Sequence, residues 1–394
     1  MISVEEARQR VFSLLSTMPV EAVPLAQAAG RVLAEPVSAE RDQPPFPASA
    51  MDGYALRNVE VHEGATFTVI GTAAAGHAFE GSIGEGQAVR IFTGAPVPPG
   101  ADRVVIQEDT QRAGDTITLS GDIDPQHYVR PAGNDFPKGF SLLAPRVLSA
   151  SDLALIASMN RPVVMVHRRP VVAIIATGDE LVMPGEVPRD DQIIASNAFG
   201  LKALAEAQGA ETRLLPIAKD THASLRMALE LAEGADMIVT IGGASVGDHD
   251  LVGEVAQDMG LERSFYKIAM RPGKPLMAGR MGDAVMLGLP GNPVSSMVCA
   301  HLFMLPALDA MQGLPAAAPR RHTARLATPL GPNGQREHYM RAQVKGGEIT
   351  AFDRQDSALL SILSDANALL IRPVGDGSRE TGETVEYLRI APER

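Results

Sequence analysis

The sequence predicts a multidomain protein of the α/β plus β class, and three observations carry this prediction. Strand-like apolar runs alternate with helical runs between residues 169 and 312, which is typical of a doubly wound parallel sheet. Glycines separate short apolar runs in residues 46–140, as in a β-rich module. Residues 313–321 form a Pro- and Ala-rich linker, and short strands with turn residues follow it up to residue 394.

The N-terminal half is predicted to combine a helical domain, made of residues 1–45 and 141–168, with the inserted β-rich domain 46–140. A capping-box pattern from Ser3 to Glu6 predicts an amphipathic helix that runs to Leu15. A second helical run covers residues 25–33 and ends before Pro36. Ser149 to Asp152 is predicted to cap a third helix at 153–159.

The α/β domain is predicted over residues 169–312, and the C-terminal β domain over 313–394. Within the α/β domain, strands are expected at 171–176, 213–217, 237–241, 265–269 and 284–289. Helices are expected at 196–208 between Ser196 and Gly209, at 222–233 after Thr221, near 250–259, and at 294–311.

Composition excludes several classes of protein. The net charge of −12 and the absence of tryptophan argue against nucleic-acid binding. The single cysteine, Cys299, excludes an internal disulfide framework and a cysteine-based zinc site. We expect no membrane-spanning helix and no secretory signal, and therefore a cytoplasmic protein.

Four loops carry the strongest functional signal. They are Thr-Gly-Asp-Glu at 177–180, Gly-Gly-Ala-Ser-Val-Gly-Asp at 242–248, Pro-Gly-Lys-Pro at 272–275 and Pro-Gly-Asn-Pro at 290–293. Three of them directly follow predicted strands, and the carboxyl ends of parallel strands share one edge of the sheet. Glycine-rich loops bring backbone N–H groups close to anions, and neighbouring carboxylates can hold Mg²⁺. The sequence therefore predicts a nucleotide-sized phosphate and metal site at this edge.

Several motifs together resemble one family. Residues 44–55 (PPFPASAMDGYA), 91–96 (IFTGAP) and 129–135 (VRPAGND), and then the loops above up to Ser295, follow one another as in the molybdopterin molybdenumtransferases. These are the MoeA family, to which the C-terminal part of gephyrin is also similar. Small departures are Ala244, His249 and Arg271, where many relatives have Val, Tyr and Lys.

The resemblance implies the last step of molybdenum cofactor biosynthesis. The enzyme would take adenylylated molybdopterin and molybdate, insert the metal at the dithiolene and release AMP, with Mg²⁺ as the cofactor. The fold would be elongated, with a MogA-like α/β module and a small C-terminal β-barrel. The protein would act as a homodimer with its active site between subunits, and other proteins of cofactor biosynthesis are candidate partners.

The resemblance also implies roles for individual residues. The implied catalytic residues are Glu180, Asp248, Asp52, Thr93, Asp135 and Asp220. Glu180 and Asp248 would be the Mg²⁺ ligands, whereas Asp52, Thr93 and Asp135 would come from the partner subunit. Local turn or cap contacts are the alternative for Asp52, Thr93, Asp135, Asp179 and Asp220.

Substrate binding is assigned to the four loops. The residues are Thr177, Gly178, Gly242, Gly243, Ser245, Gly247, Arg271, Gly273, Lys274, Pro290, Gly291, Asn292, Pro293 and Ser295. Residues 290–295 open the last helix and are expected to form the molybdate pocket, because a helix N-terminus favours an anion. Ser295, Arg341 and Arg372 could join that pocket.

Two other hypotheses remain open at this point. A molybdopterin-binding or scaffolding protein could use the same module without catalysing a reaction, although the acids Glu180 and Asp248 favour chemistry. A molybdopterin adenylyltransferase would need only the α/β module and ATP, and the additional N-terminal and C-terminal segments argue against it.

Overall fold

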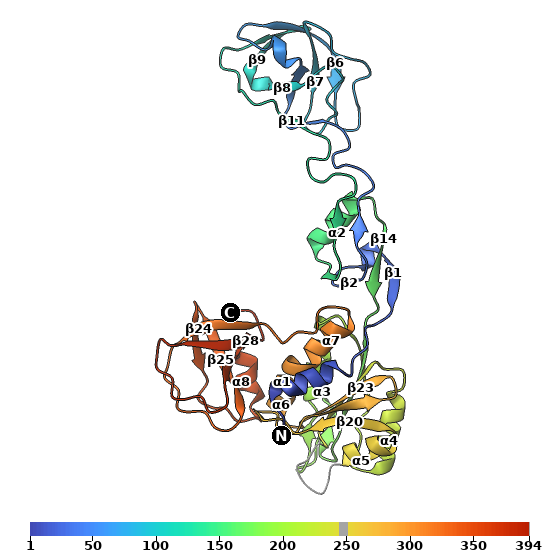
Figure 1. The fold of residues 1–394 in the computed structure, drawn as a ribbon, viewed down its shortest axis with the longest axis vertical. Helices are drawn as coiled ribbons and strands as arrows, with labels where there is room; N and C mark the ends of the chain where they lie inside the picture. The colour runs from blue at the N-terminus through green and yellow to red at the C-terminus, as the bar shows by residue number, and fades with distance from the viewer. Residues whose placement is uncertain (244–250, 394) are drawn as a thin grey trace.

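The computed structural model describes residues 1–243 and 251–393. They form an elongated molecule with a β-rich lobe at one end and a narrow middle lobe. At the other end an α/β layer and a small barrel lie side by side (Figure 1). This architecture confirms the predicted multidomain α/β plus β fold.

The α/β layer contains a six-stranded sheet with the order β18-β15-β19-β23-β22-β20. Four strands are parallel, namely β15 (Val171–Ala176), β18 (Glu211–Leu214), β19 (Met237–Ile241) and β23 (Ala284–Leu289). The sheet departs from the predicted parallel arrangement at one edge. There β22 (Met277–Met281) and β20 (Leu261–Tyr266) run antiparallel, because a tight turn at Gly282 joins β22 to β23 as a hairpin.

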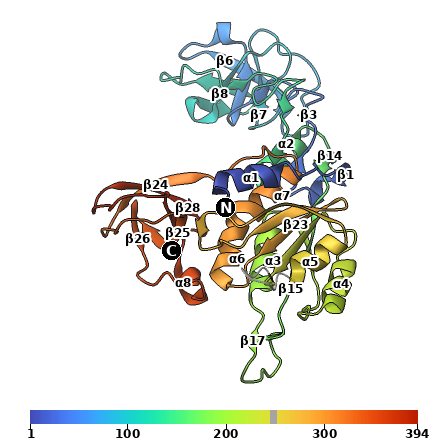
Figure 2. The ribbon, with the colours of Figure 1, turned by 60° about the horizontal axis from the view of Figure 1, so that its bottom comes forward.

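Helices cover both faces of this sheet (Figure 2). One face carries α3 (Asn197–Ala207) and the long helix formed by α6 (Pro293–Cys299), a π-helical segment (Ala300–Met304) and α7 (Leu305–Met311). The other face carries α4 (His222–Leu231) and α5 (Leu251–Asp258). Thr221 caps α4 as predicted, whereas Ser196 makes no side-chain cap bond at α3.

No membrane-spanning helix was predicted, and the structure contains one long apolar helix that lies in the core. Among the described residues, only Pro293–Met311 has the length and hydropathy of a membrane span. However, 72% of its most apolar window is buried inside the fold, which is the property of a core helix.

Helix α1 (Val4–Phe12) begins as predicted, with the Ser3 hydroxyl accepting a hydrogen bond from the Glu6 N–H at 3.0 Å. Its buried apolar side chains belong to the core of the α/β layer and not to the middle lobe; they are Val4, Ala7 and Val11. The helix therefore attaches the start of the chain to the far end of the molecule from the β-rich lobe.

The middle lobe is built from segments on both sides of the β-rich lobe. Its sheet has the order β1-β14-β2-β13, with β1 (Val20–Pro24), β2 (Val32–Leu33), β13 (Arg146–Val147) and β14 (Val163–His167). Ser149 and Asp152 form a capping box at α2 (Ala150–Ser158). The predicted helix at 25–33 is wrong: only Leu25–Gln27 is helical, as one 3₁₀ turn, and Gly30 at φ 70° redirects the chain into β2.

The β-rich lobe holds a second six-stranded sheet with the order β8-β5-β7-β6-β10-β9. Its strands are β5 (Gly53–Leu56), β6 (Thr66–Ala73), β7 (Gln87–Ile91), β8 (Arg103–Ile106), β9 (Thr110–Ala113) and β10 (Thr116–Leu119). Short pairs lie where the lobe joins the middle lobe: β4 (Ala48–Ser49) with β11 (Val129–Arg130), and β3 (Val37–Ser38) with β12 (Ser141–Leu142).

The C-terminal strands close into the predicted barrel, because β25 pairs with both β26 and β27. The strands are β24 (Arg321–Leu326), β25 (Glu337–Lys345), β26 (Glu348–Ala351), β27 (Ala368–Arg372) and β28 (Thr384–Arg389), with helix α8 (Leu360–Asp365) beside them. Strand β21 (Met270–Arg271) leaves the α/β layer and pairs with β25. This pairing brings the barrel against the α/β layer.

Candidate functional site

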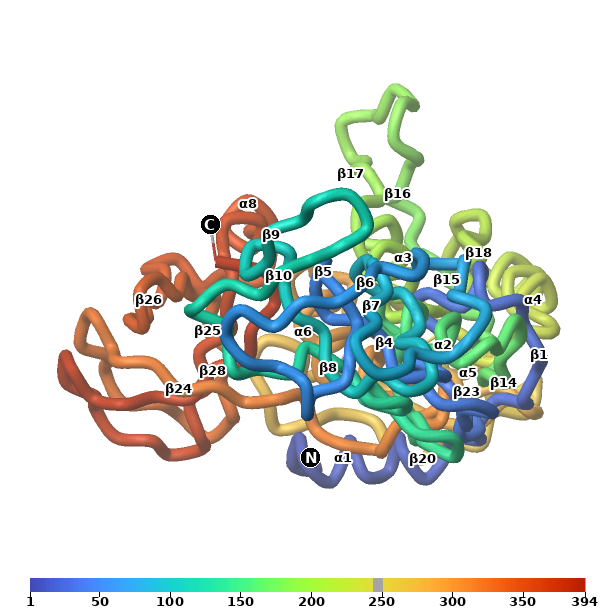
Figure 3. The backbone as a smooth tube through the Cα atoms, turned by 90° about the horizontal axis from the view of Figure 1, so that it is seen from above, coloured from blue at the N-terminus to red at the C-terminus, as the bar shows by residue number. Residues whose placement is uncertain are grey.

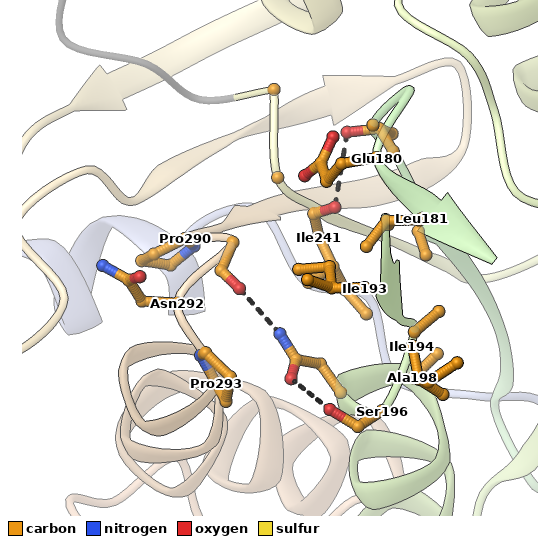
Figure 4. A pocket seen from close by; sticks show the side chains of 18 of the residues that line it. Glu180, Leu181, Ile193, Ile194, Ser196, Ala198, Ile241, Pro290, Asn292 and Pro293 are labelled. Carbon is orange, nitrogen blue, oxygen red and sulfur yellow. Dashed lines mark hydrogen bonds between the residues drawn. The ribbon is translucent and has the colours of Figure 1, made fainter. Parts of the chain in front are cut away.

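A crevice of about 620 Å³ lies at the carboxyl ends of the parallel strands. Thr177, Gly178 and Glu180 follow β15, Asp220 follows β18, and Gly242 and Gly243 follow β19. The loop Pro290, Gly291, Asn292 and Pro293 follows β23 and faces Glu180 across the crevice (Figure 4). Three of the four predicted loops therefore meet at one edge of the sheet.

The floor of the crevice requires glycine after β19. Gly242 and Gly243 have φ values of 93° and 65°, which L side chains rarely adopt. A Cβ atom on Gly243 would lie 2.2 Å from a Val252 methyl carbon, and one on Gly242 would lie 2.7 Å from the Thr177 carbonyl oxygen. Thr177 is fixed in turn, because both its N–H and its hydroxyl donate to the Ile241 carbonyl oxygen, at 2.9 and 3.3 Å.

The wall opposite Glu180 is the start of the last helix. Asn197 holds this loop by donating from Nδ2 to the Gly291 carbonyl oxygen at 2.8 Å. The helix start offers few free donors, since Pro293 has no N–H and the Val294 N–H donates to the Ser357 carbonyl oxygen at 3.0 Å. Ser295 is buried in α6 and is not among the residues that line the crevice.

Carboxylates concentrate on the Glu180 side of the crevice. Burial, and then the neighbouring Asp179 and Glu180, raise the pKa of Asp220. The Asp179 carboxylate accepts a hydrogen bond from the Asp220 N–H at 3.2 Å, which joins the loop after β15 to the loop after β18. The hydroxyl that caps α4 belongs to Thr221, so Asp220 does not act as the helix cap.

The Pro-Gly-Lys-Pro loop contributes only Pro275 to the lining of the crevice. Gly273 lies inside the protein, where a Cβ atom would be 2.6 Å from the Cys299 sulfur. The Lys274 carbonyl oxygen accepts from the Ile268 N–H at 2.9 Å, and Arg271 pairs in register with His338 of the barrel. Arg271 therefore lies beside the barrel and is not among the residues that line the crevice.

A basic cluster, formed by Arg271, His338 and Arg341, lies where β21 meets the barrel. Arg341 is completely buried, yet its Nε and Nη1 atoms have no hydrogen-bond partner among the described residues. Burial, and then Arg271, lower its pKa to about 10. Nε2 of His338 also lacks a partner in the described part of the chain, and burial followed by Arg271 lowers the pKa of His338 to about 4.

One segment of the barrel, residues 356–358, connects the basic cluster with the crevice. Arg341 donates from Nη2 to the Asp356 carbonyl oxygen, and Ala358, two residues later, lines the crevice. Arg372 does not join this cluster in binding an anion. Its guanidinium already donates hydrogen bonds to the Asp376 carboxylate and to the carbonyl oxygens of Gly331 and Gly377.

Sequence reasoning did not select His338. The signal available was a histidine and an arginine, His338 and Arg341, in a short segment that also contains the apolar residues Tyr339, Met340, Ala342 and Val344. Neither the burial of both side chains nor their proximity to Arg271 can be obtained from that pattern.

Asp52 and Thr93 lie together, but in the β-rich lobe and far from the crevice of the same chain (Figure 1). One Asp52 carboxylate oxygen accepts from both the N–H and the hydroxyl of Thr93, at 2.8 and 2.7 Å. These hydrogen bonds, the backbone one first, lower the pKa of Asp52. Asp135 is exposed in the turn at the base of this lobe. Ser245, Gly247 and Asp248 lie outside the described residues.

Three family models match consecutive parts of the chain. The MoeA N-terminal region (domain I and II) matches residues 2–160, a probable molybdopterin binding domain matches 173–310, and the MoeA C-terminal region (domain IV) matches 323–390. Together these matches cover most of the chain in family order.

Two curated relatives and a solved structure are similar over the full length. The molybdopterin molybdenumtransferase of a Nostoc species is 34% identical over 99% of this chain and 94% of its own, and that of Haemophilus influenzae is 33% identical over 98% of both. A molybdopterin biosynthesis MoeA protein from Pyrococcus horikoshii superposes with a TM-score of 0.86 at 29% identity, covering 100% of both chains. The chain therefore belongs to the MoeA family of molybdopterin molybdenumtransferases.

Proposed function

We propose that this protein inserts molybdenum from molybdate into adenylylated molybdopterin and releases AMP, the last step of molybdenum cofactor biosynthesis. The observation that carries the proposal is the crevice itself. It combines acids, left-handed glycines and a helix start in one cavity, and the buried, incompletely paired Arg341 lies next to it. A pyrophosphate and a second oxyanion could be bound there side by side.

The pyrophosphate is proposed to lie over the Gly242–Gly243 turn. Gly242 and Gly243 adopt left-handed backbone conformations that other residues rarely take, and their turn is part of the crevice lining against which the phosphates would lie. The start of α6 supplies the positive end of a helix dipole from the other side.

Mg²⁺ is proposed to bind with Glu180 and Asp248 as protein ligands. The described residues contain no group of three His, Cys, Asp or Glu side chains that could hold a metal ion by themselves. A single exposed carboxylate at the crevice fits Mg²⁺ nevertheless, because this ion usually binds through one or two carboxylates and the substrate phosphates. The ion would neutralise charge at the phosphoanhydride as that bond breaks.

Molybdate is proposed to bind at the basic cluster of Arg271, His338 and Arg341. The sequence-based expectation was a pocket at residues 290–295, but that helix start has few free N–H groups and Ser295 does not line the crevice. Nε and Nη1 of Arg341 have no hydrogen-bond partner among the described residues, so the guanidinium keeps N–H groups that can donate to an oxyanion. An anion there would also offset the repulsion between Arg341 and Arg271.

The residues of the β-rich lobe are proposed to act on the crevice of a second copy. Asp52 is ionised and ordered by Thr93, yet it lies far from the crevice of its own chain. In a homodimer, Asp52, Thr93 and Asp135 could complete the partner's site. We propose that this dimer works in the cytoplasm, since the one helix among the described residues that is apolar enough to span a membrane is mostly buried in the core.

The test is AMP release from adenylylated molybdopterin in Mg²⁺ buffer, with and without molybdate. Release that molybdate stimulates, and that Glu180→Gln reduces by about 100-fold, supports insertion, because one charged group at a reacting centre is worth about that factor. Tight pterin binding without AMP release under any condition would instead indicate a binding or scaffolding protein.

A further inference from the structure

The loop of residues 290–293, which forms one wall of the crevice, is held by a side chain from another element. Asn197 is the first residue of α3, at the base of the projecting segment that carries β16 (Leu181–Val182) and β17 (Ile193–Ile194) (Figure 3). Its Nδ2 donates to the Gly291 carbonyl oxygen at 2.8 Å, and both residues line the crevice. The position of this wall therefore depends on a side chain that the loop does not itself contain.

The Asn197 amide is oriented for this hydrogen bond. The Ser196 hydroxyl donates to Oδ1 of Asn197 at 3.3 Å, so the amide oxygen faces Ser196 and the amide nitrogen faces Gly291 (Figure 4). Serine is a common helix cap, yet Ser196 makes no side-chain cap bond at α3. The hydroxyl that could cap the helix supports Asn197 instead.

The loop has few main-chain donors with which to fix itself. Two of its four residues are prolines, which have no N–H. The chain before it is fixed at Leu289, whose carbonyl oxygen accepts from the Gly242 N–H at 3.0 Å. At Gly291 the loop lies close to the crevice floor, because a Cβ atom there would come within 3.4 Å of the Gly242 Cα atom. The Asn197 bond thus holds the loop where it approaches the Gly242 turn.

The far end of the loop is bonded to the barrel. The Val294 N–H donates to the Ser357 carbonyl oxygen at 3.0 Å, and the carbonyl oxygen of the preceding residue, Asp356, accepts from Nη2 of Arg341 at 2.9 Å. The loop therefore connects with the parts of the protein that carry both proposed anion sites, the Gly242 turn and the basic cluster. A shift of the loop would change the crevice between them.

Helix α3 is a rigid support for Asn197. Leu201 and Ala205 are completely buried in the core, and Gly200 packs so closely on α6 that a Cβ atom would lie 2.9 Å from the Met297 sulfur. A side chain on a packed helix holds its partner more precisely than one on a loop. Loss of the Asn197 bond should therefore release the loop and leave the helix in place.

We propose that Asn197 is a positioning residue, which holds Gly291 near the Gly242 turn and so sets the width of the crevice in which the substrate reacts. The proposal rests on the proposed function only for its effect on turnover. The hold on the loop is measured in the free protein, so the two can fail separately.

The first experiment measures hydrogen exchange in the full chain at pH 7.5, without ligand. The Val294 N–H should exchange about fivefold faster in Asn197→Asp, because an ionised carboxylate cannot donate to Gly291 and the loss of one hydrogen bond favours opening by about that factor. The matched control is Asn160→Asp, the same substitution at an exposed position of the middle lobe. It should leave the exchange of Val294 unchanged.

The second experiment measures AMP release from adenylylated molybdopterin, relative to the wild type at the same pH. At pH 7.5, Asn197→Asp and Asn197→Ala should both be about tenfold slower, since neither side chain can donate. At pH 5 the protonated carboxyl group of Asn197→Asp can donate to Gly291 again. Its relative rate should then exceed that of Asn197→Ala by about threefold, as one restored hydrogen bond allows.

Three results would overturn the proposal. The first is a wild-type rate in Asn197→Ala, and the second is equal relative rates of the two variants at pH 5. The third is slower AMP release with unchanged exchange at Val294, because Asn197 would then act by touching the substrate and not by holding the loop. If the wild type itself releases no AMP, the proposed function fails, and the exchange of Val294 alone decides whether Asn197 holds the loop.

Discussion

Arg341 donates one hydrogen bond, from Nη2 to the Asp356 carbonyl oxygen at 2.9 Å, although its guanidinium is completely buried. Its Nε and Nη1 atoms have no partner among the described residues. A buried cation that lacks partners is costly unless an anion binds to it. In the proposed function, this unpaired cation would bind an oxyanion next to the segment 356–358, of which Ala358 lines the crevice.

We therefore predict that Arg341→Met abolishes the stimulation of AMP release by molybdate and leaves pterin nucleotide binding unchanged. Stability should stay equal or rise, because replacing an unpaired buried charge by an apolar side chain removes a desolvation cost. The measurements are AMP release against molybdate concentration, and thermal unfolding.

Arg372→Met is the matched control for this variant. Arg372 is also buried in the barrel, but it forms an ion pair with Asp376 at 2.5 Å. Breaking a buried pair by removing one partner costs about 3 kcal/mol. Loss of stability in Arg341→Met, with molybdate stimulation intact, would contradict the assignment of Arg341 as an anion ligand.

Gly243→Ala should be far more damaging than Gly346→Ala. Both glycines have φ values near 60°, so each substitution costs about 1 kcal/mol for the backbone. Only at Gly243 does the new Cβ atom meet a neighbour, Val252, and such overpacking costs about 1–3 kcal/mol more. Urea unfolding checks the difference, and equal losses in the two variants would show that the crevice floor tolerates a side chain.

His338 should make the protein sensitive to acid. Burial, and then Arg271, hold its pKa at about 4 in the folded protein, against about 6.5 for an ordinary histidine. Between these values the unfolded chain binds a proton that the folded chain does not, so stability falls as pH falls from 6.5 to 4, by about 3 kcal/mol in total. At neutral pH this contribution to stability is fully present.

The variant that checks this prediction is His338→Gln, studied by urea unfolding at pH 7.5 and 4.5. It should lose less stability than the wild type over this interval, whereas His77→Gln, on the surface of the β-rich lobe, should behave as the wild type does. An unchanged pH dependence in His338→Gln would place the acid sensitivity elsewhere, for example at His301, whose pKa burial also lowers to about 4.

Subunit complementation should separate the two halves of the site. Asp52→Ala and Glu180→Gln are each expected to be inactive, because the proposed site takes Asp52 from one subunit and Glu180 from the other. Random mixing of the two variants should recover about a quarter of the wild-type AMP release, since half of the dimers are mixed and each carries one intact site. No recovery after verified subunit exchange would contradict a shared site.

Much of the α/β layer could be predicted from the sequence. Strands β15, β19 and β23 are continuous apolar runs, so they were located to the residue. The strand β22 and the short β2 were missed, since their existence depends on a hairpin partner and on pairing with distant segments. Periodicity within one segment carries no information about such partners.

In the candidate site, too, features set by the order of strands could be predicted, whereas contacts between distant parts of the chain could not. Glu180, Asp220 and Gly242 follow strands of one sheet, so their convergence follows from topology. Arg271 was assigned to the crevice but points to the barrel, because β21 pairs with β25 across two parts of the chain. The domain limits and the roles of Asp52, Thr93, Asp135 and Asp248 stay predictions.

The most direct test of the central claim is the stoichiometry of a single turnover. Enzyme in excess over adenylylated molybdopterin, supplied with molybdate and Mg²⁺, should yield one AMP for each molybdenum recovered on the pterin. AMP released at the same rate without molybdate, or without molybdenum on the pterin, would contradict the account and leave a phosphoanhydride hydrolase in place of an insertase.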